Sequence, residues 1–257
     1  MFKRIAAHYI VAPAADWSGG LRLVFDIETD GLLDNATMVH CIVVGDLDHD
    51  EIHTYGPSEI TAALEHLGRA DYLTGHNICS YDLALLQRLH GWVPSPRCTV
   101  IDTLIAGRLI FPHITELDDR VGATTKQSLG KLRGRYSLEA WGARLGIAKT
   151  GTDIENWSAW SPEMQERCIG DVRICKALWH LLQPGGYSRR AMELEHRAAA
   201  VCDRITADGV PFNTHAAKRL DGAPRPAQGQ AGAAISRHQL EFTPADRRTA
   251  RSARMGS

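Results

Sequence analysis

Apolar residues occur along this chain in two rhythms, as short continuous runs near the beginning and as helix-spaced groups further on. Three early runs have the length and the β-branched or aromatic content of strands, at residues 21–28, 39–44 and 51–55. The polar segment 47–50 separates the second run from the third and fits a hairpin connection. The folded part of the chain is therefore expected to begin with consecutive strands.

Strands and helices are expected to alternate after residue 57. The pattern indicates helices at 58–67, 81–89 and 104–109, short strands at 72–74 and 100–101, and mostly helical structure over 137–183. Ser58 and Ser137 can each cap a helix, and Ser161, Pro162 and Glu163 combine a cap, an N1 proline and an acid that the helix dipole favours. This order predicts an α/β fold with a mixed central sheet flanked by helices.

The last part of the chain changes character twice. A polar, alanine-rich helix is expected over 190–207, followed by a turn at Asp208-Gly209 and a short helical restart. Beyond Leu220 the composition shifts to Ala, Gly, Pro, Arg and Ser without apolar periodicity, so we expect residues 221–257 to be disordered. Residues 1–20 are expected to form an N-terminal extension.

Composition and charge limit the classes of function. The chain has 257 residues, 44% hydrophobic and 23% charged, which is ordinary for a soluble globular protein. Its formal net charge of −1 means that any attraction to phosphate must be local. Six scattered cysteines without a CxxC pair fit a reducing cytosol, and no apolar run suits a signal peptide or membrane anchor. We therefore expect a cytoplasmic protein.

Two acidic residues stand in the first predicted strand. Asp26 and Glu28 are two positions apart, so both carboxylates leave the same face, roughly 7 Å apart. Without a cation they would repel each other and lose solvation, whereas Mg²⁺ or Mn²⁺ would remove both penalties. The alternative is an edge strand with two solvated acids. The apolar residues at 23–25 before them favour a strand that is buried on both faces.

Three ordered motifs carry a family resemblance. Residues 25–32, Phe-Asp-Ile-Glu-Thr-Asp-Gly-Leu, resemble the first exonuclease motif of the DnaQ-like proofreading nucleases, the DEDD group. Residues 75–82, Gly-His-Asn-Ile-Cys-Ser-Tyr-Asp, are similar to the second motif, and Asp171 falls where the third motif is expected. Segments 101–104 and 137–146 are similar to bacteriophage family A DNA polymerases. The resemblance covers about residues 21–183.

The resemblance implies a ribonuclease H-like fold and a 3′→5′ exonuclease that cleaves phosphodiester bonds with two divalent metal ions, Mg²⁺ or Mn²⁺. The implied catalytic and metal-binding residues are Asp26, Glu28, Asp82 and Asp171. Positions that match contacts to the terminal nucleotide are Thr29, Leu32 and Asn77. His76 has a substrate-binding and a structural interpretation of equal weight. The implied substrate is the 3′ end of single-stranded DNA, in replication proofreading, and the choice of DNA over RNA rests on the family alone.

The resemblance also divides the chain. Residues 21–187 would be the exonuclease domain, and 188–220 the helical start of a polymerase-like region, because 195–199 and 208–212 resemble its opening. The residues that would hold polymerase catalytic acids do not follow, so polymerisation is not expected. A separately encoded DNA polymerase is then a candidate partner. A frameshift or gene break after about Leu220 would account for the change in composition.

One position departs from the family pattern. The third motif ordinarily has Tyr four residues before its Asp or His five residues before it, and here those positions hold Arg167 and Glu166. On a helix Arg167 lies one turn from Asp171, so it could pair with that acid or reach a substrate phosphate. We expect metal binding to survive while the chemical step is weakened, because a group that orients water is missing.

A basic stretch follows residue 119. It contains no acid up to residue 138 and carries Arg120, Lys126, Lys131, Arg133 and Arg135. As a group, with Lys131 and Arg133 foremost, these residues could guide a single strand toward the acids, and the alternative is a solvated loop. Four tryptophans, at 141, 157, 160 and 179, are expected to pack the helical layer rather than stack bases.

Two other functions remain open beside a DNA exonuclease. One is a catalytically weakened or silent nucleic-acid-binding remnant of a phage polymerase, which Arg167 and the change after Leu220 favour. The other is a related exoribonuclease.

Overall fold

The computed structural model describes residues 19–120, 129–150, 154, 156–209 and 211–221. By its contacts the chain divides into two compact units, residues 1–208 and 209–257. In the second unit the described part contains one helix, α10 (Thr214–Asp221). The predicted disordered tail lies outside the described residues apart from Asp221, which ends α10. The predicted N-terminal extension also lies outside them, apart from Gly19 and Gly20.

Within the described residues, five strands form one mixed sheet in the order β3-β2-β1-β4-β5. Their bounds are β1 (Arg22–Thr29), β2 (Val39–Asp46), β3 (Ile52–Tyr55), β4 (Tyr72–Gly75) and β5 (Thr99–Asp102). β1 is antiparallel to β2 and β2 to β3, whereas β1, β4 and β5 run parallel. β1 is thus the central strand, with antiparallel β2 on one side and parallel β4 on the other.

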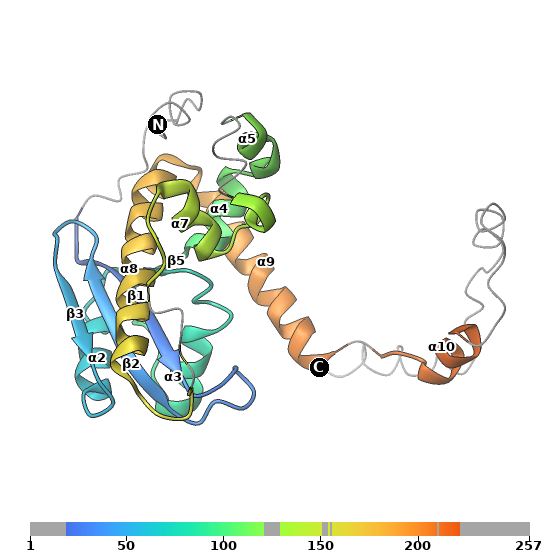
Figure 1. Ribbon diagram of the computed structural model, residues 1–257, viewed down its shortest axis with the longest axis horizontal. Coiled ribbons are helices and arrows are strands. Elements are labelled where there is room, and N and C mark those ends of the chain that lie inside the picture. The colour runs from blue at the N-terminus through green and yellow to red at the C-terminus, as the bar shows by residue number, and fades with distance from the viewer. Residues whose placement is uncertain (1–18, 121–128, 151–153, 155, 210, 222–257) are drawn as a thin grey trace, which may run out of the picture. The chain divides into compact units, whose positions relative to one another are not determined.

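Helices cover both faces of this sheet. Among the described residues of the first unit, the α-helices are α2 (Ile60–Leu67), α3 (Asp82–His90), α4 (Thr103–Ile110), α5 (Ile114–Arg120), α7 (Leu138–Leu145), α8 (Pro162–Leu182) and α9 (Arg189–Asp208). α8 lies against β1 and β2 and has α4 and α7 beside it (Figure 1). Short 3₁₀ turns lie at Gly130–Leu132 and Pro184–Gly186.

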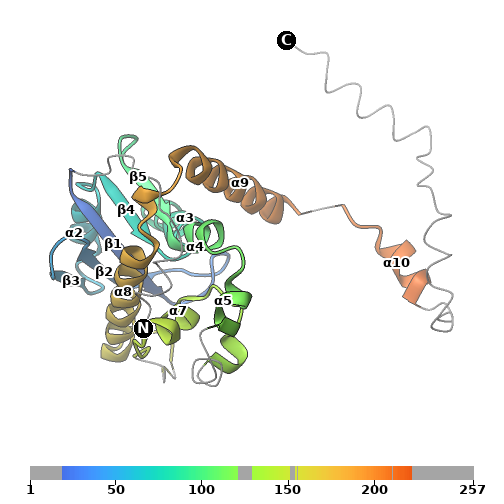
Figure 2. The ribbon, with the colours of Figure 1, turned by 90° about the horizontal axis from the view of Figure 1, so that it is seen from above.

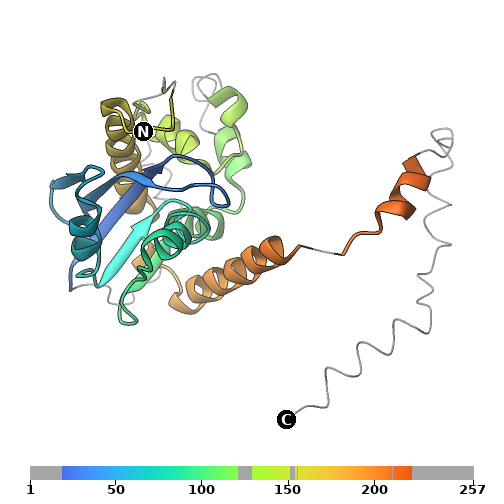
Figure 3. The ribbon, with the colours of Figure 1, turned by 90° about the horizontal axis from the view of Figure 1, so that it is seen from below.

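The side chains of β1 alternate between the two faces of the sheet, and the core is therefore divided into two hydrophobic clusters. Val24 packs with α8 residues such as Val172 in the first cluster. Leu23 and Phe25 point to the opposite face and pack with residues of α2 and α3 such as Leu85. The two turned views show the sheet with its helical layers from above (Figure 2) and from below (Figure 3). The predicted α/β fold with a mixed, helix-flanked sheet is confirmed.

Local signals placed several helix ends. The hydroxyl of Ser137 accepts from the Ala140 N–H, and that of Ser161 accepts from the Met164 N–H, as the caps predicted. α2 is an exception, because it begins at Ile60 with Glu59 rather than Ser58 before it. A turn moves the start, since the Glu59 side chain accepts from the Gly56 N–H and the Glu59 N–H donates to the Gly56 carbonyl.

β4 ends at Gly75, where the chain approaches β1 too closely for a side chain. A Cβ atom there would lie 2.2 Å from Cγ2 of Ile78 and 2.7 Å from the Phe25 carbonyl oxygen. β4 pairs with β1 only opposite residues 22–24, so no parallel strand of the described ranges lies beside the later part of β1. The turn after Gly75, in which Asn77 has a φ of 66°, then leads into α3.

Replacing Gly75 with Ala should therefore destabilise the fold. Overpacking at a site that cannot relax costs about 1–3 kcal/mol in the free energy of unfolding. Chemical denaturation of the metal-free protein would measure this loss. Gly56→Ala is the matched control, because the nearest atom to its Cβ would be Glu59 Oε2 at 3.7 Å. Equal stability of the two variants would contradict the close approach.

Candidate metal centre

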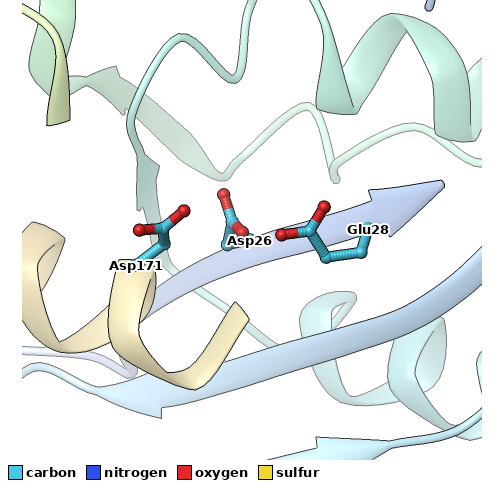
Figure 4. Close-up of side chains that lie close together, drawn as sticks. All are labelled: Asp26, Glu28 and Asp171. Atoms are coloured by element: carbon cyan, nitrogen blue, oxygen red, sulfur yellow. The ribbon is translucent and has the colours of Figure 1, made fainter. Parts of the chain in front are cut away.

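β1 places two carboxylates on the face of the sheet that α8 covers. Asp26 and Glu28 share this face with Val24, because side chains alternate along a strand. Asp171 comes from α8, next to the core residue Val172. Figure 4 shows the three carboxylates turned toward one another, two from β1 and one from α8. We call Asp26, Glu28 and Asp171 the acidic cluster.

The acidic cluster is compact and largely shielded from solvent. One carboxylate oxygen from each of its residues lies within 4.8 Å of the others. Glu28 is 8% and Asp171 6% exposed, whereas Asp26 is half-buried. Oδ1 of Asp171 is buried and has no hydrogen-bond partner in the described part of the chain. A buried carboxylate oxygen without a donor is costly, and coordination to a cation would satisfy it.

Burial and mutual repulsion disfavour the charged forms of these acids. Loss of solvent, followed by repulsion from Asp82, Asp171 and Glu28, raises the pKa of Asp26 well above its ordinary value. Burial raises the pKa of Glu28 to about 7, although the charge of Arg167 acts in the opposite direction. Metal ligands must be deprotonated, so binding of a cation here would release protons near neutral pH.

Asp82 lies beside the acidic cluster at the start of α3. It is 4% exposed, and burial raises its pKa to about 7 while a hydrogen bond from the Ile27 backbone N–H favours the charged form. Its charge also acts on Asp26. The carboxylate of Asp82 is not among those that lie within 4.8 Å of one another. The four predicted acids thus gather at β1, three of them tightly and Asp82 as a neighbour.

Another buried acid, Asp102, holds the turn that leads to Asp82. Its Oδ1 accepts from the backbone N–H groups of Asn77 and Leu104, at 2.9 and 2.8 Å, and its Oδ2 accepts from the Cys79 N–H at 3.1 Å. Asp102 is also the N-cap of α4. The sequence placed Asp102 in a family-like segment and gave it no role. Its structural role is to fix the second motif.

His76 lies in the same turn and contacts a buried hydroxyl. Its Nδ1 lies 2.9 Å from Oγ1 of Thr103, which also donates to the Gly75 carbonyl. Burial lowers the pKa of His76 to about 4, so the ring is neutral at pH 7. These contacts agree with the structural interpretation of His76. Asn77, by contrast, is exposed at the turn.

Two basic side chains contact the acidic cluster. Nε of Arg167 lies 2.9 Å from Oε1 of Glu28, in an ion pair whose N–H is not aligned for a hydrogen bond. Nζ of Lys149 lies 2.9 Å from Oδ2 of Asp171. The expected alternative in which Arg167 pairs with Asp171 is therefore wrong. Arg167 pairs instead with Glu28 of β1, and Lys149 pairs with Asp171.

A pocket of about 310 Å³ opens beside Glu28. Its lining residues are Ile27, Glu28, Thr29, Gly31, Leu32, Tyr81 and Trp157. Leu32 is 76% exposed, and the hydroxyl of Tyr81 donates to the Gly31 carbonyl and lies 2.5 Å from Oγ1 of Thr29. The pocket therefore combines an exposed apolar side chain, two aromatic rings and a carboxylate of the cluster.

The expectation that all four tryptophans pack the helical layer is wrong for two of them. Trp141 and Trp179 are buried in the core as expected. Trp157 is 38% exposed and lines the pocket, and Trp160 is 39% exposed. The ring of Trp157 also lies 5.6 Å from the guanidinium carbon of Arg167. The sequence pattern of spaced tryptophans did not separate these two environments.

The basic stretch is partly neutralised by the helix that precedes it. Arg133 makes two hydrogen bonds to Asp119, at 2.7 and 2.6 Å, and Arg120 lies 3.6 Å from Glu116. Lys131 is exposed, and Lys126 lies outside the described residues. Arg120 and Arg133 of the basic stretch therefore pair with acidic residues of α5.

The donor set fits a hard divalent cation. All its ligand atoms are carboxylate oxygens, and Oδ1 of Asp171 is buried without a donor from any residue that the structure describes. Asp26, Glu28 and Asp171 could hold such an ion, with Asp82 as a further ligand nearby. Oxygen ligands of this kind suit Mg²⁺ or Mn²⁺. Cys168 contacts the same strand, where its Sγ donates to the Asp26 carbonyl.

Comparison with known proteins places the fold in a family. A model described as the RNase H superfamily matches residues 23–160, and the chain belongs to this family. The DNA-directed DNA polymerases of Enterobacteria phage T3 and Escherichia phage T7 are each 31% identical over 243 residues, covering 77% of this chain and 34% of theirs. The chain thus spans about a third of the length of these relatives. The predicted resemblance to phage polymerases is confirmed.

A solved structure gives a more distant similarity. Brucella melitensis NrnC bound to pGG aligns with a TM-score of 0.44 and 18% identity, covering 75% of this chain and 84% of that one. A separate property concerns membranes: no helix in the described ranges is both long and apolar enough to span a bilayer.

Replacing Asp82 with Asn should stabilise the metal-free protein more at pH 8 than at pH 5. Folding raises the pKa of this carboxyl from 3.8 to about 7, so the folded state binds more protons between these values. Stability of the wild-type protein therefore falls as the pH rises through this range, and the Asn variant avoids that loss. We expect a Tm advantage at pH 8 of at least about 3 °C, since 1 kcal/mol corresponds to roughly 2–4 °C at this size.

Thermal unfolding in EDTA at both pH values measures this effect. Glu65→Gln, which neutralises an exposed acid of α2, is the control and should leave the pH dependence unchanged. A Tm difference between Asp82→Asn and wild type that stays constant from pH 5 to pH 8 would contradict the raised pKa.

Proposed function

We propose that the chain is a divalent-metal-dependent 3′→5′ exonuclease that acts on the 3′ ends of single-stranded DNA. The observation that carries the proposal is the acidic cluster, in which three carboxylate oxygens lie within 4.8 Å beside an apolar pocket. Asp26, Glu28 and Asp171, with Asp82 adjacent, would hold the metal ions. Two such ions, when bound, supply activation of water and stabilise charge on a phosphodiester that is being cleaved.

The pocket supports an end-specific substrate. Trp157 and Tyr81 offer aromatic surfaces, and exposed Leu32 offers an apolar one, within the same space as Glu28. Nucleobases stack on aromatic side chains with about 1–3 kcal/mol per base. A terminal nucleobase in this pocket would bring its phosphate toward the acidic cluster. Thr29 and Asn77 are assigned to the same terminal nucleotide through the family motifs.

Similarity to the phage DNA polymerases supports DNA as substrate and proofreading as the setting. A separately encoded DNA polymerase is then the proposed partner. Lys131 and Arg133 remain proposed contacts to the single strand, with Lys131 the stronger of the two, because Asp119 accepts hydrogen bonds from Nε and Nη2 of Arg133.

A second function is favoured by the ion pairs at the cluster. Arg167 and Lys149 each occupy an oxygen of a proposed metal ligand, at Glu28 and Asp171. An acid that is already paired with a basic side chain binds a metal ion less tightly. A protein that binds single-stranded nucleic acid without cleaving it would have this arrangement. The two functions differ in whether the phosphodiester bond is broken.

Cleavage assays separate these functions. The protein should shorten 5′-labelled single-stranded DNA stepwise from its 3′ end with Mg²⁺ or Mn²⁺, and a 3′-phosphate on the strand should slow it. Asp26→Ala should lower the rate by at least about 10²-fold, because a metal ligand is lost. Glu65→Gln, outside the site, should retain the wild-type rate. An RNA strand of the same sequence tests the exoribonuclease alternative.

A strand that is bound but never shortened, by either wild type or variant, would favour the silent binding protein. Cleavage of RNA in preference to DNA would correct the proposed substrate. Cleavage that continues in Asp26→Ala would show that the acidic cluster is not the active site.

Replacing Arg167 with Tyr should raise the turnover number. The change removes a cation from Glu28 and supplies a hydroxyl that can orient the attacking water, a contribution worth about 10²–10⁴-fold. Arg167→Phe is the matched variant, because it removes the cation without supplying a hydroxyl. We expect Tyr to exceed Phe and Phe to equal or slightly exceed wild type in single-turnover cleavage. Equal or lower turnover of the Tyr variant would count against the missing water-orienting group.

A further inference from the structure

The two ion pairs at the acidic cluster are built by separate parts of the chain. Lys149 follows α7 and contacts Asp171, whereas Arg167 is a residue of α8 and contacts Glu28 on β1. The side chains of Lys149 and Arg167 are 20% and 26% exposed. Both cations are therefore partly buried. Each lies beside a carboxylate whose repulsion by the neighbouring acids would otherwise be uncompensated.

Local packing fixes Lys149 at this position. Oγ1 of Thr150 donates to the Glu166 carbonyl, which anchors the segment to the first half of α8. Gly170 permits the approach, because a Cβ atom there would lie 2.3 Å from Oγ1 of Thr150. At the other end, the Ile147 N–H donates to the Gly142 carbonyl at the end of α7. The segment from 147 to 150 is thus held at both ends, with Lys149 directed to Asp171.

A different segment holds Arg167. The Trp157 ring lies 5.6 Å from its guanidinium carbon, a cation–π distance. The Trp157 carbonyl in turn lies 2.8 Å from Nε2 of His40 on β2. The guanidinium therefore lies between an aromatic ring fixed to the sheet and the carboxylate of Glu28.

Charge makes these contacts consequential. Metal ligands must be ionised. In that form the acidic cluster and Asp82 together carry four negative charges, and Lys149 and Arg167 balance two of them. We propose that Lys149 and Arg167 are resident counter-cations, which stabilise the metal-free fold and lower its affinity for divalent cations. This inference rests on the proposed function for the identity of the metal ligands. It adds that divalent affinity is set by side chains that are not ligands.

Calorimetric titration of the intact protein with Mn²⁺ tests the inference without any nuclease readout. Lys149→Gln and Arg167→Gln should each bind Mn²⁺ about tenfold more tightly than wild type, because a cation close to the ion has been removed. In EDTA each variant should have a lower Tm, since a buried carboxylate has lost its partner. Saturating Mn²⁺ should then raise the Tm of each variant more than it raises that of wild type.

Three further variants separate charge from structural damage. Lys149→Arg retains the charge and should bind Mn²⁺ as wild type does. Gly170→Ala removes no charge but should turn Oγ1 of Thr150 away from the Glu166 carbonyl, which releases one anchor of the segment bearing Lys149, so its Mn²⁺ affinity should rise toward that of Lys149→Gln. Arg189→Gln removes an exposed ion pair with Glu193 on α9 and should change nothing.

Unchanged or weaker Mn²⁺ binding by both Gln variants would overturn the inference, as would a Lys149→Arg variant that behaves like Lys149→Gln. Failure of the proposed function would give a different result. If the substituted proteins bind Mn²⁺ more tightly but the protein does not cleave DNA, the counter-cation inference stands and the exonuclease proposal fails.

Discussion

Repulsion among buried carboxylates is the constraint around which this structure is arranged. Asp26 and Glu28 lie on the central strand, where α8 excludes water and adds Asp171. Removal of water raises the energy of each charge, and proximity raises it further. Protonation, divalent cations and basic side chains are the three ways to lower this energy. The raised pKa values of Glu28 and Asp82 reflect the first way, and Lys149 and Arg167 supply the third.

Much of the fold and the common face of two of the acids follow from local patterns in the sequence. Apolar runs predicted the ends of all five described strands to within about two residues, because a buried strand needs a run of apolar residue types. The spacing of Asp26 and Glu28 fixed their common face. Asp171 could be placed only through the family motif, since its distance from β1 depends on how α8 crosses the sheet.

The features that the sequence did not reveal are those that tertiary contacts create. Lys149 is a single lysine in a loop, and nothing in its neighbours indicates Asp171 as a partner. α5 was not expected either, and it is tied to the core by a buried pair between Asp118 and Arg144, 26 positions apart. Trp157 has the same spacing signal as a core tryptophan, and only the course of the loop decides its exposure. Pairing and exposure of this kind require the packed structure.

Asp102 extends the consequences of the site to α9. Its carboxylate holds the second motif, and its backbone N–H donates to Nε2 of His196 on α9. Because Nδ1 of His196 lies 2.8 Å from the Met192 carbonyl, the proton of the neutral ring belongs on Nδ1. A second contact joins Ser80 to Asp203 of α9 at 2.8 Å. α9, which contains residues that resemble the start of the polymerase region, is therefore hydrogen-bonded to Asp102 and to Ser80. Both residues help to position Asp82. The boundary predicted at residue 187 would separate these partners, whereas hydrogen bonds across it join the second motif to α9.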